Sequence, residues 1–154
     1  MSAATSSLVT QDRNDKPRAG WPESLQQEYL ESEFSGCVGS VLVSETDRVR
    51  VWHLHIPPGK RCSFHRHVLH YFWTAHNAGR ARGYYGDGRV VDVVHYKGET
   101  KHFKFGPGEF MVHSVENIGD TDLLFTTVEF LDSPNSPLPV PDDIRLSRSE
   151  AKPG

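Results

Sequence analysis

Two histidines separated by one residue, His65 and His67, form the pattern in this sequence that most clearly could do chemistry. Side chains two residues apart on a β-strand point to the same face, so both imidazoles can reach one point. Neutral imidazole is a good ligand for Fe, Cu, Ni or Zn. A third ligand must come from elsewhere, and His113 is the best candidate because it follows the tight turn Pro107-Gly108 on a later strand. The spacing therefore predicts a metal site at these three histidines.

A second pair with the same spacing, His53 and His55, alternates with apolar residues of its own strand. The alternation predicts that the apolar face lies in a core or a dimer interface and that both histidines face solvent or a partner. We also predict that His95 and His102 lie at the surface.

The elements that would position these histidines are strands. Between residues 36 and 131 the sequence consists of short β-type runs separated by turns rich in Gly and Pro: 38–44, 49–56, 84–86, 90–94, 101–105, 110–115 and 123–131. The pair Asp87-Gly88 between two of these runs is typical of a tight hairpin. No helical pattern interrupts the series. We therefore predict an all-β domain, an antiparallel sandwich or barrel, over residues 36–131.

The two ends of the chain have a different character. Residues 1–20 are small, polar and charged, and predict a disordered arm. Residues 21–35 predict a short helix and arm, with Pro22 and Glu23 suited to its first turn. Residues 132–154 contain four closely spaced prolines, which favour an extended, Pro-rich arm over the surface.

Composition excludes several classes of function. The chain has 154 residues and a net charge of −3, which argues against nucleic acid or an anionic membrane as a partner. No apolar run reaches the roughly 20 residues of a membrane-spanning helix, and the first ten residues lack the pattern of a signal peptide. Two cysteines favour a thiol-reduced, cytoplasmic location.

Glycines, histidines and an asparagine together resemble the two motifs of the cupin superfamily. The first motif is G-x5-HxH-x3-4-E-x6-G and the second is roughly G-x5-PxG-x2-H-x3-N. The residues that carry the resemblance, which covers about residues 40–131, are Gly59, His65, His67, Gly79, Gly98, Pro107, Gly108, His113 and Asn117. It implies a cupin-type double-stranded β-barrel, or jelly roll, with one divalent transition metal: Fe first, with Mn, Ni, Cu or Zn as alternatives.

One position departs from the first motif. The glutamate that cupins use as a metal ligand corresponds to Phe72 or, with the shorter gap, to Tyr71. A three-histidine site remains possible, as in the cupins related to thiol dioxygenases, and it leaves coordination positions open for substrate and O2. Glu109 and His70 are candidates for a replacement fourth ligand, with His76 ranked below them.

A narrower resemblance spans residues 50–141. The segments from Phe64 to Val91 and from His102 to Pro139 are similar to small bacterial cupins labelled beta-alanine degradation protein BauB. This similarity implies a metal-dependent enzyme, dioxygenase-like or a lyase or isomerase, that acts on a small carboxylate in amino-acid or beta-alanine-type catabolism. Arg82 and Tyr84 are the candidates for binding that substrate.

Two other functions stay open at this point. A cupin without the glutamate ligand could bind a small molecule without catalysis, as a sensor or pathway accessory. The Pro-rich end and the arms are also compatible with a structural or interaction module. Under every reading we expect a homodimer, because a small barrel with open strand edges must protect them.

Overall fold

The computed structural model describes residues 18–146, so the arm predicted over residues 1–20 lies outside it up to residue 17, as do residues 147–154. One helix is followed by nine strands and a short 3-10 helix. The helix is α2 (Glu23–Ser32). The strands are β1 (Val41–Glu45), β2 (Val49–Ile56), β3 (His65–His67), β4 (Tyr71–Ala75), β5 (Gly79–Tyr85), β6 (Val90–His95), β7 (Thr100–Phe103), β8 (Met111–Asn117) and β9 (Leu123–Phe130). The 3-10 helix is η2 (Asp142–Ile144).

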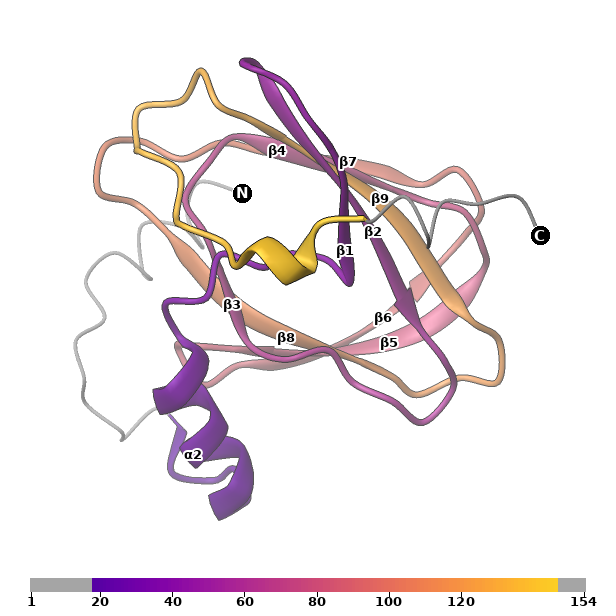
Figure 1. Ribbon diagram of the computed structural model, residues 1–154. Coiled ribbons are helices and arrows are strands. Elements are labelled where there is room, and N and C mark those ends of the chain that lie inside the picture. Colours follow the sequence, from indigo (N-terminus) through magenta and orange to yellow (C-terminus); the bar gives the residue numbers. More distant parts are fainter. Residues whose placement is uncertain (1–17, 147–154) are drawn as a thin grey trace.

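The strands form two antiparallel sheets that face each other across a common interior (Figure 1). The first sheet has the order β1-β2-β9-β4-β7 and the second has the order β3-β8-β5-β6. This is the predicted all-β jelly roll, with the helix outside the barrel. Strands β7 and β6 each form one edge of their sheet, and both contribute to the cavity described below.

Period-two alternation explains why the central strands sit where they do. In β2, Trp52 and Ile56 are buried while His53 and His55 are exposed, as predicted. The strand pairs over its whole length with β9, from Val49 opposite Phe130 to Ile56 opposite Leu123. The interior of the barrel is therefore built from one face of each strand.

The predicted hairpin between β5 and β6 is confirmed. Gly88 has a φ of 95°, a left-handed conformation that only glycine adopts without strain. Its N–H donates to the carbonyl of Tyr85 at 2.8 Å, which closes the turn. The register that follows, from Tyr84 opposite Val90 to Gly79 opposite His95, decides which residues of β5 face the interior.

Strand β4 was not among the predicted runs. Its sequence, Tyr71-Phe-Trp-Thr-Ala75, carries large aromatic residues on both faces, so it lacks the alternation that marks a half-buried strand. It lies between β9 and β7 in the first sheet. Its place matters because Tyr71 and Trp73 both line the cavity.

Helix α2 covers the outer face of the second sheet. The predicted helix over residues 21–35 is observed from Glu23 to Ser32, with Pro22 as the residue before its first turn. Leu25 and Tyr29 pack with Trp21 on apolar residues of the sheet, Phe64 and Val112. The helix is thereby fixed to the two strands that carry the predicted metal ligands.

The segment after β9 lies along the barrel. The Asn135 side chain donates to the carbonyl oxygens of Val68 and Gly106, both at 3.0 Å. Further on, the carbonyl of Leu138 accepts from Arg50 at 2.9 Å. Among the residues described, no helix is long and apolar enough to cross a membrane.

Candidate metal centre and its cavity

The three predicted histidines meet at one end of the interior. Strand β3 pairs with β8 so that His65 lies opposite His113 and His67 lies opposite Met111. One ligand nitrogen from each histidine lies within 4.8 Å of the others. His65 and His67 are 3% and 2% exposed, and His113 is partly buried. The register of two short strands therefore assembles the cluster that the sequence spacing predicted.

The protonation states of the three imidazoles suit metal binding. Burial lowers the pKa of His65 to about 4 and holds the pKa values of His67 and His113 well below the usual value, so all three are neutral at pH 7. The Nδ1 atom of His65 lies 2.9 Å from the carbonyl oxygen of Ser63. Because a carbonyl only accepts, Nδ1 carries the proton and the Nε2 lone pair is left free.

The distances within the cluster also fit a metal ion. The Nε2 atoms of His67 and His113 are 3.2 Å apart. Two nitrogens that bind one ion at about 2.0–2.1 Å with tetrahedral to octahedral angles would be about 2.9–3.4 Å apart. The Nδ1 atoms of the same two rings are buried and have no hydrogen-bond partner in residues 18–146. An ion bound at the two Nε2 atoms would account for their close approach, and it would leave the buried Nδ1 atoms without a partner.

The structure resolves which residue takes the place of the cupin glutamate. Tyr71 points inward and stacks on the ring of His67, with centroids 4.0 Å apart and planes at 11°. Phe72 points to the outside of the sheet, where it contacts His102 and Phe130. Burial raises the pKa of Tyr71 well above its usual value, so the hydroxyl stays protonated. Of the two residues at which the motif could place its glutamate, Tyr71 is therefore the one that faces the histidines.

The candidates for a fourth ligand lie elsewhere. Glu109 turns back to its own loop, where Oε1 accepts from the N–H of Gly106 at 2.6 Å. The Nδ1 atom of His70 accepts from the N–H of Phe105 at 3.1 Å. His76 is exposed and bonds to a threonine hydroxyl on the outer face. Within the described part of the chain, no carboxylate joins the three histidines.

A cavity of about 320 Å3 extends from the three histidines between the two sheets. Its wall is mostly apolar and aromatic, with contributions from Tyr71, Trp73, Tyr85, Phe103, Met111 and Phe125. Tyr85 approaches the metal cluster, with its ring centroid 5.5 Å from that of His113. A cavity of this size can hold a small organic molecule beside the metal position.

Arg82 and Tyr84 do not line this cavity, contrary to the expectation that they bind the substrate. In β5 the inward residues are Ala81 and Gly83, so Arg82 and Tyr84 have the opposite parity. The Arg82 guanidinium pairs with Asp92 of β6 at 2.7 and 3.0 Å on the outer face. The hydroxyl of Tyr84 donates to Glu116 outside the barrel, at 2.8 Å.

The prediction that His95 lies at the surface was also wrong. His95 is 8% exposed and lines the cavity, with its Nδ1 atom 2.8 Å from Glu99 Oε1. Its ring packs edge-on against Trp73 and Phe125. The parity of β6 places His95 on the same face as the cavity valines. That signal was available from the sequence once the hairpin register was known.

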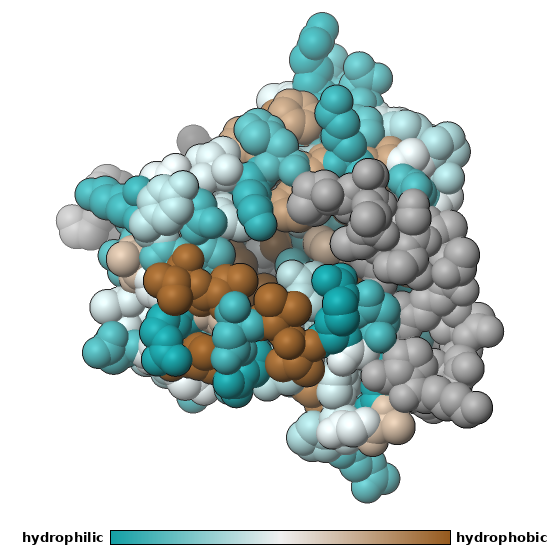
Figure 2. Space-filling model, turned by 180° about the vertical axis from the view of Figure 1, so that it is seen from behind, coloured by the Kyte–Doolittle hydropathy of each residue, from teal (hydrophilic) through white to brown (hydrophobic). Residues whose placement is uncertain are grey.

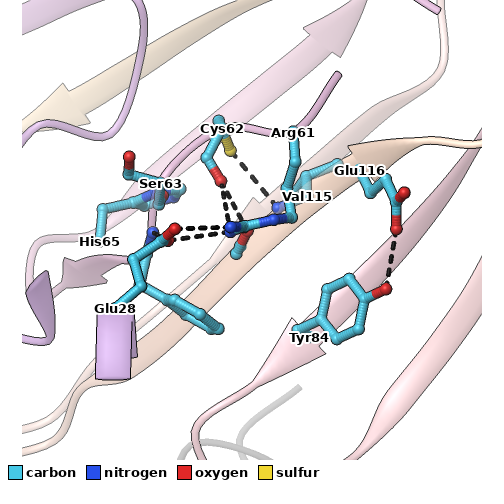
Figure 3. A network of polar contacts seen from close by, with 10 residues as sticks. Glu28, Arg61, Cys62, Ser63, His65, Tyr84, Val115 and Glu116 are labelled. Atoms are coloured by element: carbon cyan, nitrogen blue, oxygen red, sulfur yellow. Dashed lines mark hydrogen bonds and ion pairs between the residues drawn. The ribbon is translucent and has the colours of Figure 1, made fainter. Parts of the chain in front are cut away.

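A polar network on the outer side of the sheet connects α2 to both ligand-bearing strands (Figure 3). Arg61 forms a two-point ion pair with Glu28 of α2, at 2.9 and 2.5 Å. The same guanidinium donates to the hydroxyl of Ser114, which follows His113, at 2.7 Å. Glu28 also accepts from the N–H of Phe64, which precedes His65, at 3.2 Å. Arg61 and Glu28 therefore hold the chain next to two of the three histidines.

We expect Arg61→Gln to weaken metal binding by about tenfold while leaving the barrel folded. The physical reason is that groups behind the ligands orient them, and their loss typically costs about 10- to 100-fold in metal affinity. Isothermal titration with Co2+ or Zn2+ measures the change, and circular dichroism checks the fold.

Arg145→Gln is the matched control, because it removes an ion pair with Glu45 that lies away from the histidines. Arg61→Lys keeps the charge and should recover part of the affinity. Equal metal affinity in Arg61→Gln and Arg145→Gln would contradict the positioning role.

Comparison with known proteins gives the fold a name. No family model and no curated protein matches this sequence. A solved cupin domain from Bordetella pertussis superposes with a TM-score of 0.52 at 24% identity, over 60% of this chain and 93% of that chain. A protein with a double-stranded β-helix domain from Klebsiella pneumoniae gives a TM-score of 0.47 at 26% identity, over 65% and 76% of the two chains. An RmlC-like cupin family protein from Methanocaldococcus jannaschii gives 0.47 at 17%, over 58% and 76%.

The fold is therefore the double-stranded β-helix of cupin domains. Within that fold, three histidines from two adjacent strands form a cluster that could hold a metal ion at one end of an apolar cavity. The described chain therefore combines a cupin fold with a three-histidine cluster.

Proposed function

We propose that this protein is a metal-dependent enzyme that acts on a small carboxylate, with one divalent transition metal held by His65, His67 and His113. The single observation that carries the proposal is the convergence of three neutral imidazoles, two of them buried and one partly buried, at the end of a cavity large enough for a substrate. Iron is our first choice of metal, and a dioxygenase-like reaction is our first choice of chemistry. Three protein ligands leave coordination positions open for a substrate and for O2.

The roles of the protein's own residues follow from their positions. The metal, when bound, would supply Lewis-acid or redox chemistry at the histidine cluster. Tyr71 fixes the ring plane of His67 by stacking on it, and Ser63 fixes the tautomer of His65. The aromatic wall keeps bulk water away from the reacting end, which strengthens every polar interaction there. Arg61 holds the ligand-bearing strands in register from outside.

Other parts of the proposal rest on sequence resemblance. A role in beta-alanine-type catabolism comes from the similarity to proteins labelled BauB. The homodimer and the cytoplasmic location also stay predictions. Two exposed valines of β6, an edge strand, do not line the cavity and are compatible with a partner: Val90 is 47% and Val94 is 74% exposed.

Oxygen uptake tests the enzymatic function. The protein is loaded with Fe2+ under anaerobic conditions and mixed with aerated buffer that contains one small carboxylate at a time. We expect uptake of one O2 per substrate consumed with at least one carboxylate, and no uptake by His65→Ala/His113→Ala. Failure of every carboxylate to elicit uptake above that variant, in iron-loaded protein, would refute the dioxygenase.

A second candidate function has its own support. No carboxylate joins the three histidines within residues 18–146, and the apolar cavity could retain a ligand without converting it. A protein of this kind would be a sensor or an accessory of a pathway. It predicts stoichiometric ligand binding that is the same with and without metal, and no turnover.

A further inference from the structure

The opening of the cavity is defined by the few wall residues that are exposed. These are Arg89, Val91, Val93 and Lys101, whereas the other residues of the wall are buried or partly buried. They come from the β5–β6 turn, from β6 and from β7, and each of these two strands is one edge of its sheet. The cavity therefore opens between β6 and β7.

The β6 side of this opening is apolar, whereas Arg89 and Lys101 add charge beside it. Val91 and Val93 are 36% and 40% exposed, although valine in a folded domain is usually buried. Figure 2, which views the molecule from behind, shows a group of apolar residues at the surface beside a hollow. Deeper in the wall, Trp73 and Phe125 continue the apolar surface. A ligand that enters here passes the two valines and then meets the rings of Trp73 and Phe125.

The charged groups of the cavity leave one cation without a counter-ion. His95 and Glu99 are paired with each other at 2.8 Å. Arg89 is paired with Asp87 at 2.8 Å and lies over the ring of Tyr85. Lys101 has no ion pair with any residue that the structure describes. The side chain of Thr100 bonds to Thr74 on the outer face of the sheet. Lys101 is the next residue of β7, so its side chain lies on the opposite face, toward the cavity.

We propose that the cavity takes a small apolar monocarboxylate, aromatic by preference, whose carboxylate pairs with Lys101 at the opening and whose apolar body lies against Trp73. The inference rests on the proposed function, because it assigns the substrate class of the same cavity. It follows that the end of the molecule opposite the carboxylate points toward the three histidines. A zwitterion such as β-alanine fits poorly, because its ammonium group would lose water without gaining a free carboxylate.

An inward-pointing lysine on an edge strand has an alternative explanation, which is that it prevents edge-to-edge aggregation. In that role Lys101 would not bind a ligand. The two roles are separated by asking whether Lys101 distinguishes an acid from a neutral molecule of the same shape.

Phenylacetate and phenylacetamide are suitable probes, because they differ in charge and hardly in shape. Isothermal titration gives the affinity, and the fluorescence of Trp73 in the cavity gives a second signal that Trp73→Phe should remove. We expect phenylacetate to bind at least about tenfold more tightly than phenylacetamide or β-alanine, as a hydrogen-bonded charge pair allows. Lys101→Gln should abolish the preference for the acid and leave the affinity for the amide unchanged.

Lys104→Gln is the matched control, because Lys104 is an exposed lysine close in sequence that does not line the cavity. It should keep the preference for the acid. Equal affinity for acid and amide in the unmodified protein would overturn the inference, as would an unchanged preference in Lys101→Gln.

The same titration on His65→Ala/His113→Ala separates this inference from the metal-dependent function. If that variant still prefers phenylacetate, the assignment of the ligand class stands whether or not the protein uses a metal. If it folds but has lost the preference for the acid, the carboxylate pairs with something other than Lys101, and the inference fails.

Discussion

Replacing both His65 and His113 by alanine is expected to lower the affinity for a divalent transition metal by at least about 100-fold. The expectation follows from geometry, since the two side chains supply two of three converging ligands and nothing else in the described chain can replace them. Loss of a group that only orients a ligand already costs about 10- to 100-fold. Metal content by mass spectrometry, after purification without added metal or chelator, measures the effect.

The second histidine pair provides a matched control. His53 and His55 have the same spacing on β2, in the other sheet, but both side chains are exposed on the outer face. His53→Ala/His55→Ala should therefore bind metal like the unmodified protein. If the two double variants lost metal equally, surface histidines and not the cavity cluster would be the binding site.

Replacing Glu129 by glutamine is expected to stabilise the protein at pH 8 and to change its stability little at pH 5. Glu129 lies inside the barrel, where Oε1 accepts from the indole of Trp52 at 2.8 Å. Burial raises the pKa of its carboxyl from 4.5 to about 7. Glutamine keeps the oxygen that accepts from Trp52 and cannot ionise.

The direction of the pH dependence follows from proton binding. Between pH 4.5 and 7 the folded protein holds the Glu129 proton that the unfolded chain has released, so the free energy of unfolding falls as the pH rises. A pKa shift of this size corresponds to about 3 kcal/mol above pH 7. Urea denaturation at the two pH values measures the difference. Glu31→Gln, at an exposed position of α2, should show no such pH dependence, and a Glu129→Gln variant that behaved like it would disprove the effect.

The fold could be predicted from local patterns where those patterns were strong. The run 49–56 alternates cleanly, and β2 has the same bounds. The hairpin at Gly88 needed only a residue that tolerates positive φ. Strand β4 was missed because aromatic residues occupy both of its faces, and only packing against β9 and β7 determines which of them is interior.

The residues of the candidate site also differ in whether local sequence patterns could predict them. His65 and His67 could be predicted because period two fixes their relative direction, and His113 followed from a turn and a strand. Arg82 and Tyr84 were placed inside because the parity of β5 could not be counted from a known starting point. Lys101 was not considered, since its importance depends on β7 being an edge strand at a cavity opening.

Competition from backbone N–H groups explains why two candidate ligands lie away from the histidines. Glu109 and His70 were proposed as ligands from their distance in sequence to the histidines. Each instead bonds to a backbone N–H of the loop between β7 and β8, Glu109 to Gly106 and His70 to Phe105. A side chain that can satisfy a nearby backbone group often does so, and sequence spacing does not reveal that competition.

The central claim is that His65, His67 and His113 bind one metal ion inside the barrel. An anomalous-difference map from crystals grown with Co2+, with data collected on both sides of the cobalt absorption edge, tests it most directly. We expect one strong peak in the cavity, about 2.0–2.2 Å from a nitrogen of each of the three imidazoles. The metal site would be contradicted by a well-ordered cavity that shows no cobalt peak at the three histidines, whether or not cobalt binds elsewhere in the crystal.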